Sequence, residues 1–135
     1  MAIHPDDAAL IARVRAKVMD ALAPRSGEQH HTVRAAAGEW LPVAPGVERK
    51  VLWERSGATS CMVRLAPGTT FPPHNHPIDE ECVILQGSLR IGSDLLLRPG
   101  DFHVGLDGLE HETVSTEEGC LCFLRTAACF FEPAT

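Results

Sequence analysis

The stretch from Gly68 to Gly87, "GTTFPPHNHPIDEECVILQG", holds most of the residues that could do chemistry. His74 and His76 lie two positions apart in a segment expected to be extended, so their rings should leave the same face. A proline interrupts this segment, and extended structure resumes at Glu80 or Glu81. Two imidazoles and one of these carboxylates can then converge, and these groups are common ligands of divalent transition metals.

A second approach to the same region comes later in the chain. The turn-rich stretch "RPGDFHVGLDGLEH" ends at His111 and leads into another extended segment. No nucleophile paired with a base at motif spacing competes with the histidine cluster, and no glycine-rich phosphate loop is present in the sequence. The chemistry indicated by these residues is therefore metal binding.

The elements that must position these residues are mostly strands. Residues 5–22 predict a helix, because Pro5 and two acids suit its start and apolar residues recur at helical spacing. From residue 32 onward, short β-branched and apolar runs alternate with turn signals about every ten residues, which is typical of an all-β sandwich or barrel. We expect a helix and linker in residues 1–31 and one β-domain in residues 32–135.

Composition narrows the class of partner. The chain has 135 residues, 44% hydrophobic content and a formal net charge of −6, so it should repel nucleic acid and anionic membranes. No apolar run approaches the ~20 residues that span a bilayer, and the first residues lack the basic region of a signal peptide. The five cysteines include no CxxC pair, which favours a reducing, cytoplasmic location.

The pattern resembles the cupin superfamily. Every fixed position of its first motif is matched, by Gly68, His74, His76, Glu80 and Gly87, and its second motif is matched at Gly100, Asp101, Gly108 and His111. The resemblance implies a double-stranded β-helix, or jelly-roll barrel, preceded here by the short helix. It also implies one divalent metal ion held by His74, His76, Glu80 and His111, and the spacing to Gly87 selects Glu80 over Glu81.

Residues 38–126 resemble more narrowly the ChrR-type cupin, the C-terminal domain of certain bacterial anti-sigma factors. Full-length members of that group begin with a helical zinc-binding domain carrying a His-x3-Cys-x2-Cys motif, which this sequence lacks. We therefore expect a stand-alone relative, with a sigma factor or other regulator as a partner that the resemblance implies.

Three functions follow from the metal. Four protein ligands saturate tetrahedral zinc, the preferred ion, and this fits a sensor of an oxidant or small ligand. Iron or manganese keeps open positions, which fits a dioxygenase acting on a chelating substrate such as a diketone or thiol; nickel is a further candidate ion. The third function is a metal-stabilised module without further activity. Whether the protein is an enzyme stays open at this point. The run Cys82–Leu85 is apolar on both faces, so one side should meet the barrel interior and the other the N-terminal helix or a second subunit, and we expect a homodimer.

Four other residues are weighed beside the ligand set. Cys82 should share a strand face with Glu80, and a redox role is the alternative to simple packing. Cys120 and Cys122 share a face and are read as core, with a soft-metal or redox pair as the alternative. His103 is read as a surface residue or one behind the ligands, with an added ligand or proton shuttle as the alternative.

Overall fold

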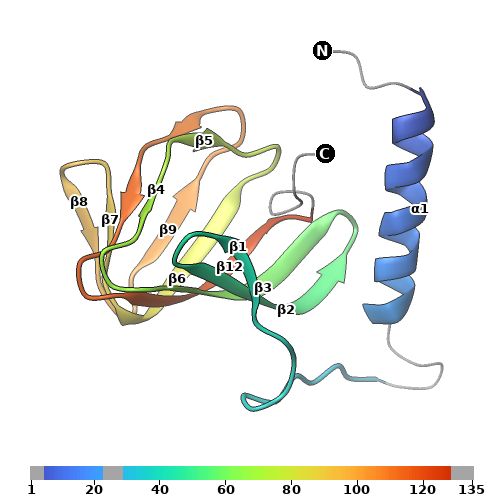
Figure 1. The fold of residues 1–135 in the computed structure, drawn as a ribbon, viewed down its shortest axis with the longest axis horizontal. Coiled ribbons are helices and arrows are strands. Elements are labelled where there is room, and N and C mark those ends of the chain that lie inside the picture. Colours follow the sequence, from blue (N-terminus) through green and yellow to red (C-terminus); the bar gives the residue numbers. More distant parts are fainter. Residues whose placement is uncertain (1–4, 23–28, 129–135) are drawn as a thin grey trace. The chain divides into compact units, whose positions relative to one another are not determined.

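The computed structural model describes residues 5–22 and 29–128. The chain divides into two compact units, Met1–Val33 and Arg34–Thr135. The first unit contains the helix and the second contains all the strands among the described residues (Figure 1). Cys129 lies outside the described residues, as does His4.

The helix α1 spans Pro5–Leu22, the range predicted from the sequence. Its apolar stripe is exposed to solvent at Leu10, Ile11, Val14 and Val18. No helix in the described part of the chain is long and apolar enough to cross a membrane.

Twelve strands, most of them short, lie among the described residues. Their bounds are β1 Leu41–Ala44, β2 Val47–Arg55, β3 Ala58–Leu65, β4 Thr70–Phe71, β5 His74–Asn75, β6 Glu80–Gly87, β7 Leu89–Ile91, β8 Leu95–Leu97, β9 Phe102–Gly105, β10 Glu110–His111, β11 Val114–Ser115 and β12 Cys120–Ala127. This content confirms the predicted all-β class with one N-terminal helix.

The strands form a jelly-roll barrel in which every pairing is antiparallel. A six-stranded sheet has the order β1-β2-β3-β12-β6-β9, and a four-stranded sheet has the order β4-β11-β7-β8 (Figure 1). Strands β5 and β10 form a separate two-stranded ladder. Apolar residues from both larger sheets make one core, including Val63, Ile84, Leu89, Ile91 and Val114.

Strand β6 carries the site into this core. Its side chains alternate between buried and partly exposed, so Glu80, Cys82 and Ile84 point inward. The pairing with β12 slips by one residue, because Leu121 faces Gln86 while Cys122 faces Ile84, which leaves Leu85 as an exposed bulge residue. Glu80 is therefore the first inward-facing residue of β6, at the mouth of the barrel.

Gly87 ends β6 at a point where two backbones meet. It has a φ of 73°, and a Cβ added there would collide with the carbonyl oxygen of Gly119. Only glycine satisfies both conditions without strain. The last glycine of the first motif thus permits the close approach of β6 to the start of β12.

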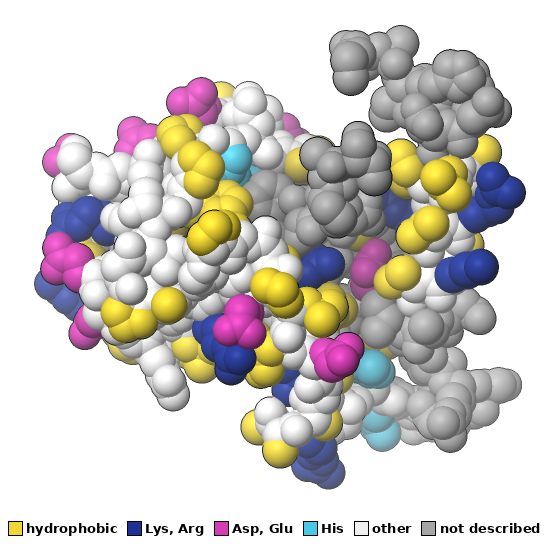
Figure 2. Space-filling view, viewed as in Figure 1, with side chains coloured by type: hydrophobic (Ala, Val, Ile, Leu, Met, Phe, Trp, Pro, Cys, Tyr) yellow, Lys and Arg dark blue, Asp and Glu magenta, His cyan; other side chains and the backbone are white. Residues whose placement is uncertain are grey.

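The surface of the barrel carries mixed charge. Figure 2 shows basic and acidic side chains close together on the visible face of the strands, with hydrophobic side chains between them. One such pair is Arg64 with Glu48, whose Nη2 and Oε2 atoms lie 3.1 Å apart. The described residues on this visible face therefore form no broad basic patch of the kind that phosphate backbones require.

Candidate metal centre

Three separate segments bring the predicted ligands to one place. His74 opens β5 and His76 follows it, Glu80 opens β6, and His111 ends β10. Strands β5 and β10 pair so that His74 and His111 are direct partners across the ladder. The turns beside these strands also hold each other, because the Gly108 amide donates to the His76 carbonyl oxygen at 3.2 Å.

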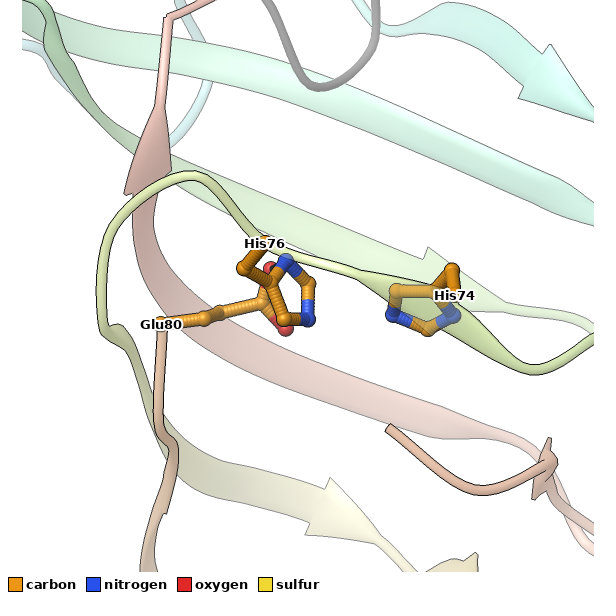
Figure 3. A group of neighbouring side chains, drawn as sticks. All are labelled: His74, His76 and Glu80. Carbon is orange, nitrogen blue, oxygen red and sulfur yellow. Dashed lines mark ion pairs between the residues drawn. The ribbon is translucent and has the colours of Figure 1, made fainter. Parts of the chain in front are cut away.

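The tightest group is His74, His76 and Glu80. One ligand atom from each lies within 4.8 Å of the other two. Figure 3 shows the carboxylate of Glu80 against the ring of His76, with the ring of His74 beside them. The Nδ1 atom of His76 and the Oε2 atom of Glu80 are 3.1 Å apart. This donor set, two imidazoles and one carboxylate at short range, fits a divalent transition metal.

His111 adjoins this group through its ring. Its imidazole stacks on that of His74, with centroids 4.9 Å apart and planes 11° apart, and lies edge-on to His76 at 5.5 Å. The structure therefore places all four sequence-predicted residues around one point of the barrel mouth. His111 is not a member of the compact group of His74, His76 and Glu80. Its place beside that group is given by the two ring-to-ring distances.

Two backbone carbonyls fix the tautomers of the outer histidines. The Nδ1 atom of His74 donates to the Pro72 carbonyl oxygen at 2.8 Å, and that of His111 donates to the Glu112 carbonyl oxygen at 3.0 Å. A carbonyl can only accept, so each Nδ1 carries the proton. Each Nε2 then has its lone pair available, which is the arrangement seen when histidine binds a metal.

Burial keeps the rings of His74 and His76 neutral. His76 is 2% exposed and His111 8% exposed, whereas His74 is half-buried. Burial, together with the neighbouring His74 and His111, lowers the pKa of His76 to about 4. Burial also lowers the pKa of His74, against a smaller opposite effect of its bond to Pro72. Neutral imidazole is the form that binds metal.

The carboxyl group of Glu80 experiences the opposite shift. It is 8% exposed, and burial raises its pKa to about 7, with the nearby Thr126 hydroxyl acting in the other direction. A cation bound at this point would favour the charged carboxylate and reverse the effect of burial. Without one, Glu80 is partly protonated near neutral pH, so its contact with neutral His76 is not an ion pair between full charges.

Gly105 makes room for His111. It ends β9 opposite Glu80, and a Cβ added to it would lie 2.9 Å from Cδ2 of His111 and 3.6 Å from Cδ2 of His76. Contacts under 3.0 Å force a neighbour to move. The absence of a side chain at Gly105 therefore leaves the space that the rings of His111 and His76 occupy. This role was not predicted from the sequence.

The neighbouring acid points elsewhere. Glu81 pairs with Val104 and Arg125 across the sheet and lies on the outer, partly exposed face of β6. The alternation along β6 thus puts Glu80 on the inner face and Glu81 on the outer face, as the motif spacing to Gly87 indicated. Cys82 returns to the inner face, where it is 5% exposed.

His103 lies next to His111, in the position behind the ligands that was one of those expected from the sequence. It pairs with Cys82 across β6 and β9, and its ring lies edge-on to that of His111 at a centroid distance of 5.6 Å. Burial, and to a lesser degree His111, lowers its pKa. Phe102 and Val104 are exposed, so His103 between them faces inward, the reverse of the orientation that two apolar neighbours would predict.

The cysteines of the described residues are free and buried. These are Cys61, Cys82, Cys120 and Cys122. Cys120 and Cys122 share the inner face of β12, as predicted, and both belong to the hydrophobic core. Their position agrees with packing as the default role of these thiols.

Comparison with known families decides the classification. The family model of the ChrR cupin-like domain matches residues 28–129. The chain belongs to the ChrR cupin-like family. The resemblance inferred from the two motifs is thereby confirmed, and the jelly-roll barrel and the histidine-rich mouth are those of a ChrR cupin-like domain.

Solved structures share the fold of this ChrR cupin-like chain. KdgF from Halomonas sp. is 22% identical, with a TM-score of 0.62 and coverage of 73% of this chain and 94% of its own. An RmlC-like cupin from Shewanella frigidimarina is 15% identical, with a TM-score of 0.65 and coverage of 73% and 91%.

A third solved structure is the complex of Rhodobacter sphaeroides SigE with the anti-sigma factor ChrR. The match is 22% identical, with a TM-score of 0.60, and it covers 89% of this chain and 76% of that one. At these identities the likeness shows the fold alone. No curated protein matches this sequence.

Proposed function

We propose that this chain is a mononuclear metal-binding cupin domain that senses an oxidant or a small ligand and signals to a regulator. His74, His76, Glu80 and His111 would hold one divalent ion. The observation that carries the proposal is the convergence of His74, His76 and Glu80 within 4.8 Å at a buried mouth, with His111 stacked on His74.

The donor set supports zinc as the preferred ion. Three imidazoles and one carboxylate complete a tetrahedral site, and a site closed by four protein ligands is typical of structural or sensory zinc. When bound, the ion supplies a positive charge that holds Glu80 ionised and ties β5, β6 and β10 together. The residues of the chain do the rest: His74 and His111 present Nε2, and their carbonyl partners hold both rings in place.

Membership of the ChrR cupin-like family supports a regulator as the partner. The solved ChrR protein is in complex with a sigma factor, SigE. We propose a sigma factor or a functionally similar regulator for this chain, contacted by its cupin domain, residues 32–135. The free, buried cysteines of the described residues support a reducing, cytoplasmic location.

A homodimer is the proposed oligomeric state. The outer face of β6 and β9 exposes Leu85, Phe102 and Val104, three large apolar residues on neighbouring strands. Burial of such a face against a second copy would remove it from water. Sedimentation velocity should give the mass of two chains, and Phe102→Asp should give one. A wild-type monomer at micromolar concentration would contradict this proposal.

The second candidate function is a metal-dependent dioxygenase acting on a small chelating substrate. A cavity of about 70 Å³ lined by His74, Glu80, His103 and His111 favours it, because a reactant could reach the ligands from inside the barrel. Iron or manganese, with open positions, would be the ion in that case. Metal-dependent oxygen consumption separates this candidate from the sensor.

The test begins with metal content. Protein purified without chelators or nickel resin should contain one divalent ion per chain by elemental analysis. His74→Ala, His76→Ala, Glu80→Gln and His111→Ala should each lose it. Glu81→Gln is the matched control, since Glu81 is the adjacent carboxylate on the opposite face, and it should keep the ion. Retention of one ion per chain by all four ligand variants would refute the site.

A further inference from the structure

A row of polar side chains crosses the inner face of the six-stranded sheet and ends at Glu80. Glu54 of β2 is the register partner of Thr59 of β3, and Thr59 is the partner of Thr126 of β12. The antiparallel pairing of β12 with β6 continues the row and brings Thr126 beside Glu80. All four residues are buried, and the two threonines are 0–1% exposed.

The adjacent positions on the same face are apolar. Two residues away on the strands of Thr59, Thr126 and Glu80 lie core residues, namely Cys61, Leu124 and Cys82. The two threonines therefore occupy core positions where valine would have nearly the same shape. A buried hydroxyl without a partner costs free energy, so these hydroxyls should serve a purpose that packing alone does not.

The polar atoms of the row have no other use among the described residues. Oγ1 of Thr59, Oγ1 of Thr126 and Oε2 of Glu80 are buried without a hydrogen-bond partner of good geometry in that part of the chain. Burial raises the pKa of Glu80, and the Thr126 hydroxyl, which approaches its carboxyl group as a donor, opposes part of that rise. An available donor thus adjoins an available carboxylate oxygen.

The chemistry of these groups fixes the direction in which they can bond. A threonine hydroxyl donates one hydrogen bond and can also accept, whereas an ionised carboxylate only accepts. Glu80 is ionised when it acts as a metal ligand, so Thr126 must donate to it. The oxygen of Thr126 is then available to accept from the hydroxyl of Thr59.

We propose that Thr126 is a positioning residue of the metal site: its hydroxyl donates to the carboxylate of Glu80 and fixes the orientation of that ligand, and Thr59 supports Thr126 from β3. Thr126 acts through Glu80 and is not itself a ligand. The effect on metal binding rests on the proposed function, whereas the contact between Thr126 and Glu80 does not. The inference extends the site to β3 and β12, outside the two motifs.

Zinc affinity is the first test, measured on the full chain by competition with a chromophoric chelator. Thr126→Val keeps the shape of the side chain and should lower the affinity about 10- to 100-fold, the usual effect of losing a group behind a ligand. Thr126→Ser keeps a hydroxyl and should restore most of the affinity. Thr59→Val should cause a smaller loss than Thr126→Val, because it reaches Glu80 only through Thr126.

Thr69→Val is the matched control. Thr69 is also a buried threonine, but its hydroxyl donates to the Gly46 carbonyl oxygen at 3.4 Å. This variant loses a buried hydroxyl without touching Glu80, so its zinc affinity should equal that of wild type. If Thr126→Val does not fold, Thr126→Ala removes the same hydroxyl and takes its place.

Cobalt(II) reports the orientation of the ligands, because its visible absorption bands depend on coordination geometry. Thr126→Val should shift the bands of the cobalt-loaded protein, whereas Thr126→Ser and Thr69→Val should leave them as in wild type. A general loss of stability would lower the occupancy of the site without moving the bands. This readout therefore distinguishes positioning of Glu80 from a purely structural role.

A double-mutant cycle tests the contact without metal. In chelator-treated protein, Thr126→Val and Glu80→Met should be non-additive, with a coupling of more than about 3-fold in the unfolding equilibrium constant. Methionine is used because it has a length similar to glutamate and is only a weak acceptor. The same cycle with Thr69→Val in place of Thr126→Val should be additive.

The outcomes separate this inference from the proposed function. A wild type that binds no zinc would refute the metal site, and the double-mutant cycle would still decide the contact. Equal zinc affinity in Thr126→Val and Thr69→Val, or a larger loss for Thr59→Val than for Thr126→Val, would overturn the positioning role and leave the metal site standing. Additive effects of Thr126→Val and Glu80→Met would overturn the contact itself.

Discussion

His74 and His111 face each other across the two-pair ladder of β5 and β10, with their ring centroids 4.9 Å apart in a stacked arrangement. Each ring is held from behind by a backbone carbonyl, of Pro72 in one case and Glu112 in the other. The two histidines are therefore oriented by backbone hydrogen bonds before any ion arrives. Preorganisation of this kind lowers the entropy lost on binding.

Removal of His111 tests whether it is a ligand or only a stacking partner of His74. His111→Ala should weaken zinc affinity by more than about 100-fold, because loss of groups behind the ligands alone causes 10- to 100-fold effects. Competition with a chromophoric chelator measures the change. His103→Ala is the comparison, since its ring contacts His111 without belonging to the motif. A loss for His111→Ala no larger than that for His103→Ala would contradict the assignment.

A methyl group at position 105 should disturb the site without touching any charge. Gly105→Ala places a Cβ 2.9 Å from the ring of His111, which must move or strain the strand. We expect a loss of about 1–3 kcal/mol in the free energy of unfolding, the usual effect of overpacking, and weaker metal binding. Urea unfolding and the chelator competition measure both. Leu95→Ala, at an exposed position on β8, should change neither.

The buried acid predicts a pH dependence of the metal-free protein. The pKa of Glu80 is raised from 4.5 to about 7 in the folded state. Its contribution to stability is therefore fully present below pH 4.5 and is lost as the pH rises through about 7. Relative to Glu80→Gln, wild type should lose up to roughly 3 kcal/mol of unfolding free energy between about pH 5 and about pH 8.

Comparison with the Gln variant isolates Glu80 from His76, whose pKa is lowered to about 4. The His76 contribution runs the other way: it is present above the ordinary histidine pKa of 6.5 and is lost as the pH falls through about 4. Urea unfolding of chelator-treated protein across this range gives both curves. Parallel curves for wild type and Glu80→Gln would show that Glu80 titrates normally.

Metal should stabilise the fold by mass action. At a free zinc concentration about 100-fold above its Kd, the free energy of unfolding should rise by about 2.7 kcal/mol. A chelator should reverse the increase, as read by thermal unfolding. His76→Ala should show no increase, because His76 belongs to the compact three-residue group. An equal gain in this variant would mean that zinc binds elsewhere.

The core itself gives a control on stability that is independent of metal. Ile84 is 1% exposed and sits on the inner face of β6, whereas its neighbour Leu85 is 43% exposed at the bulge. Ile84→Ala should cost about 2–5 kcal/mol of unfolding free energy. In chains dilute enough to be monomeric, Leu85→Ala should cost well under half of that, because its side chain is then exposed. Similar losses at the two positions in the monomeric chain would contradict the alternation of buried and exposed residues along β6.

The sequence predicted the main elements because their patterns are local. The helix has its stripe, its proline and its acids within residues 5–22, and it forms over that range. Strands such as β3 and β12 are eight residues long and rich in apolar side chains, and burial alternates along most of each strand. The short ladders at the site were harder: β5 and β10 are two residues each, and they form through pairing with each other rather than through propensity.

The site was predictable where motif spacing encodes it. Glu80 could be chosen over Glu81 because the motif spacing to Gly87 selects it, and alternation along β6 then puts Glu81 on the opposite face. The contact of His103 with His111 depends on the pairing of β9 with β6, which no local pattern specifies. The role of Gly105 was also not predictable from a local pattern, because it depends on the space that this glycine leaves beside the ring of His111.

The turn at residues 106–109 is joined to the segment that carries His76 by two hydrogen bonds among the described residues. The Gly108 amide reaches the His76 carbonyl, the Asp107 amide reaches Oδ1 of Asp79 at 2.9 Å, and Leu106 and Leu109 stand more than half exposed. An ion bound to residues of β5, β6 and β10 would make the turn at residues 106–109 more rigid, and loss of the ion would increase local opening of that turn. A bound ion should therefore slow hydrogen exchange at the nearby amides. It should also restrict the motion of the exposed Leu106 and Leu109 side chains, which a partner protein could contact.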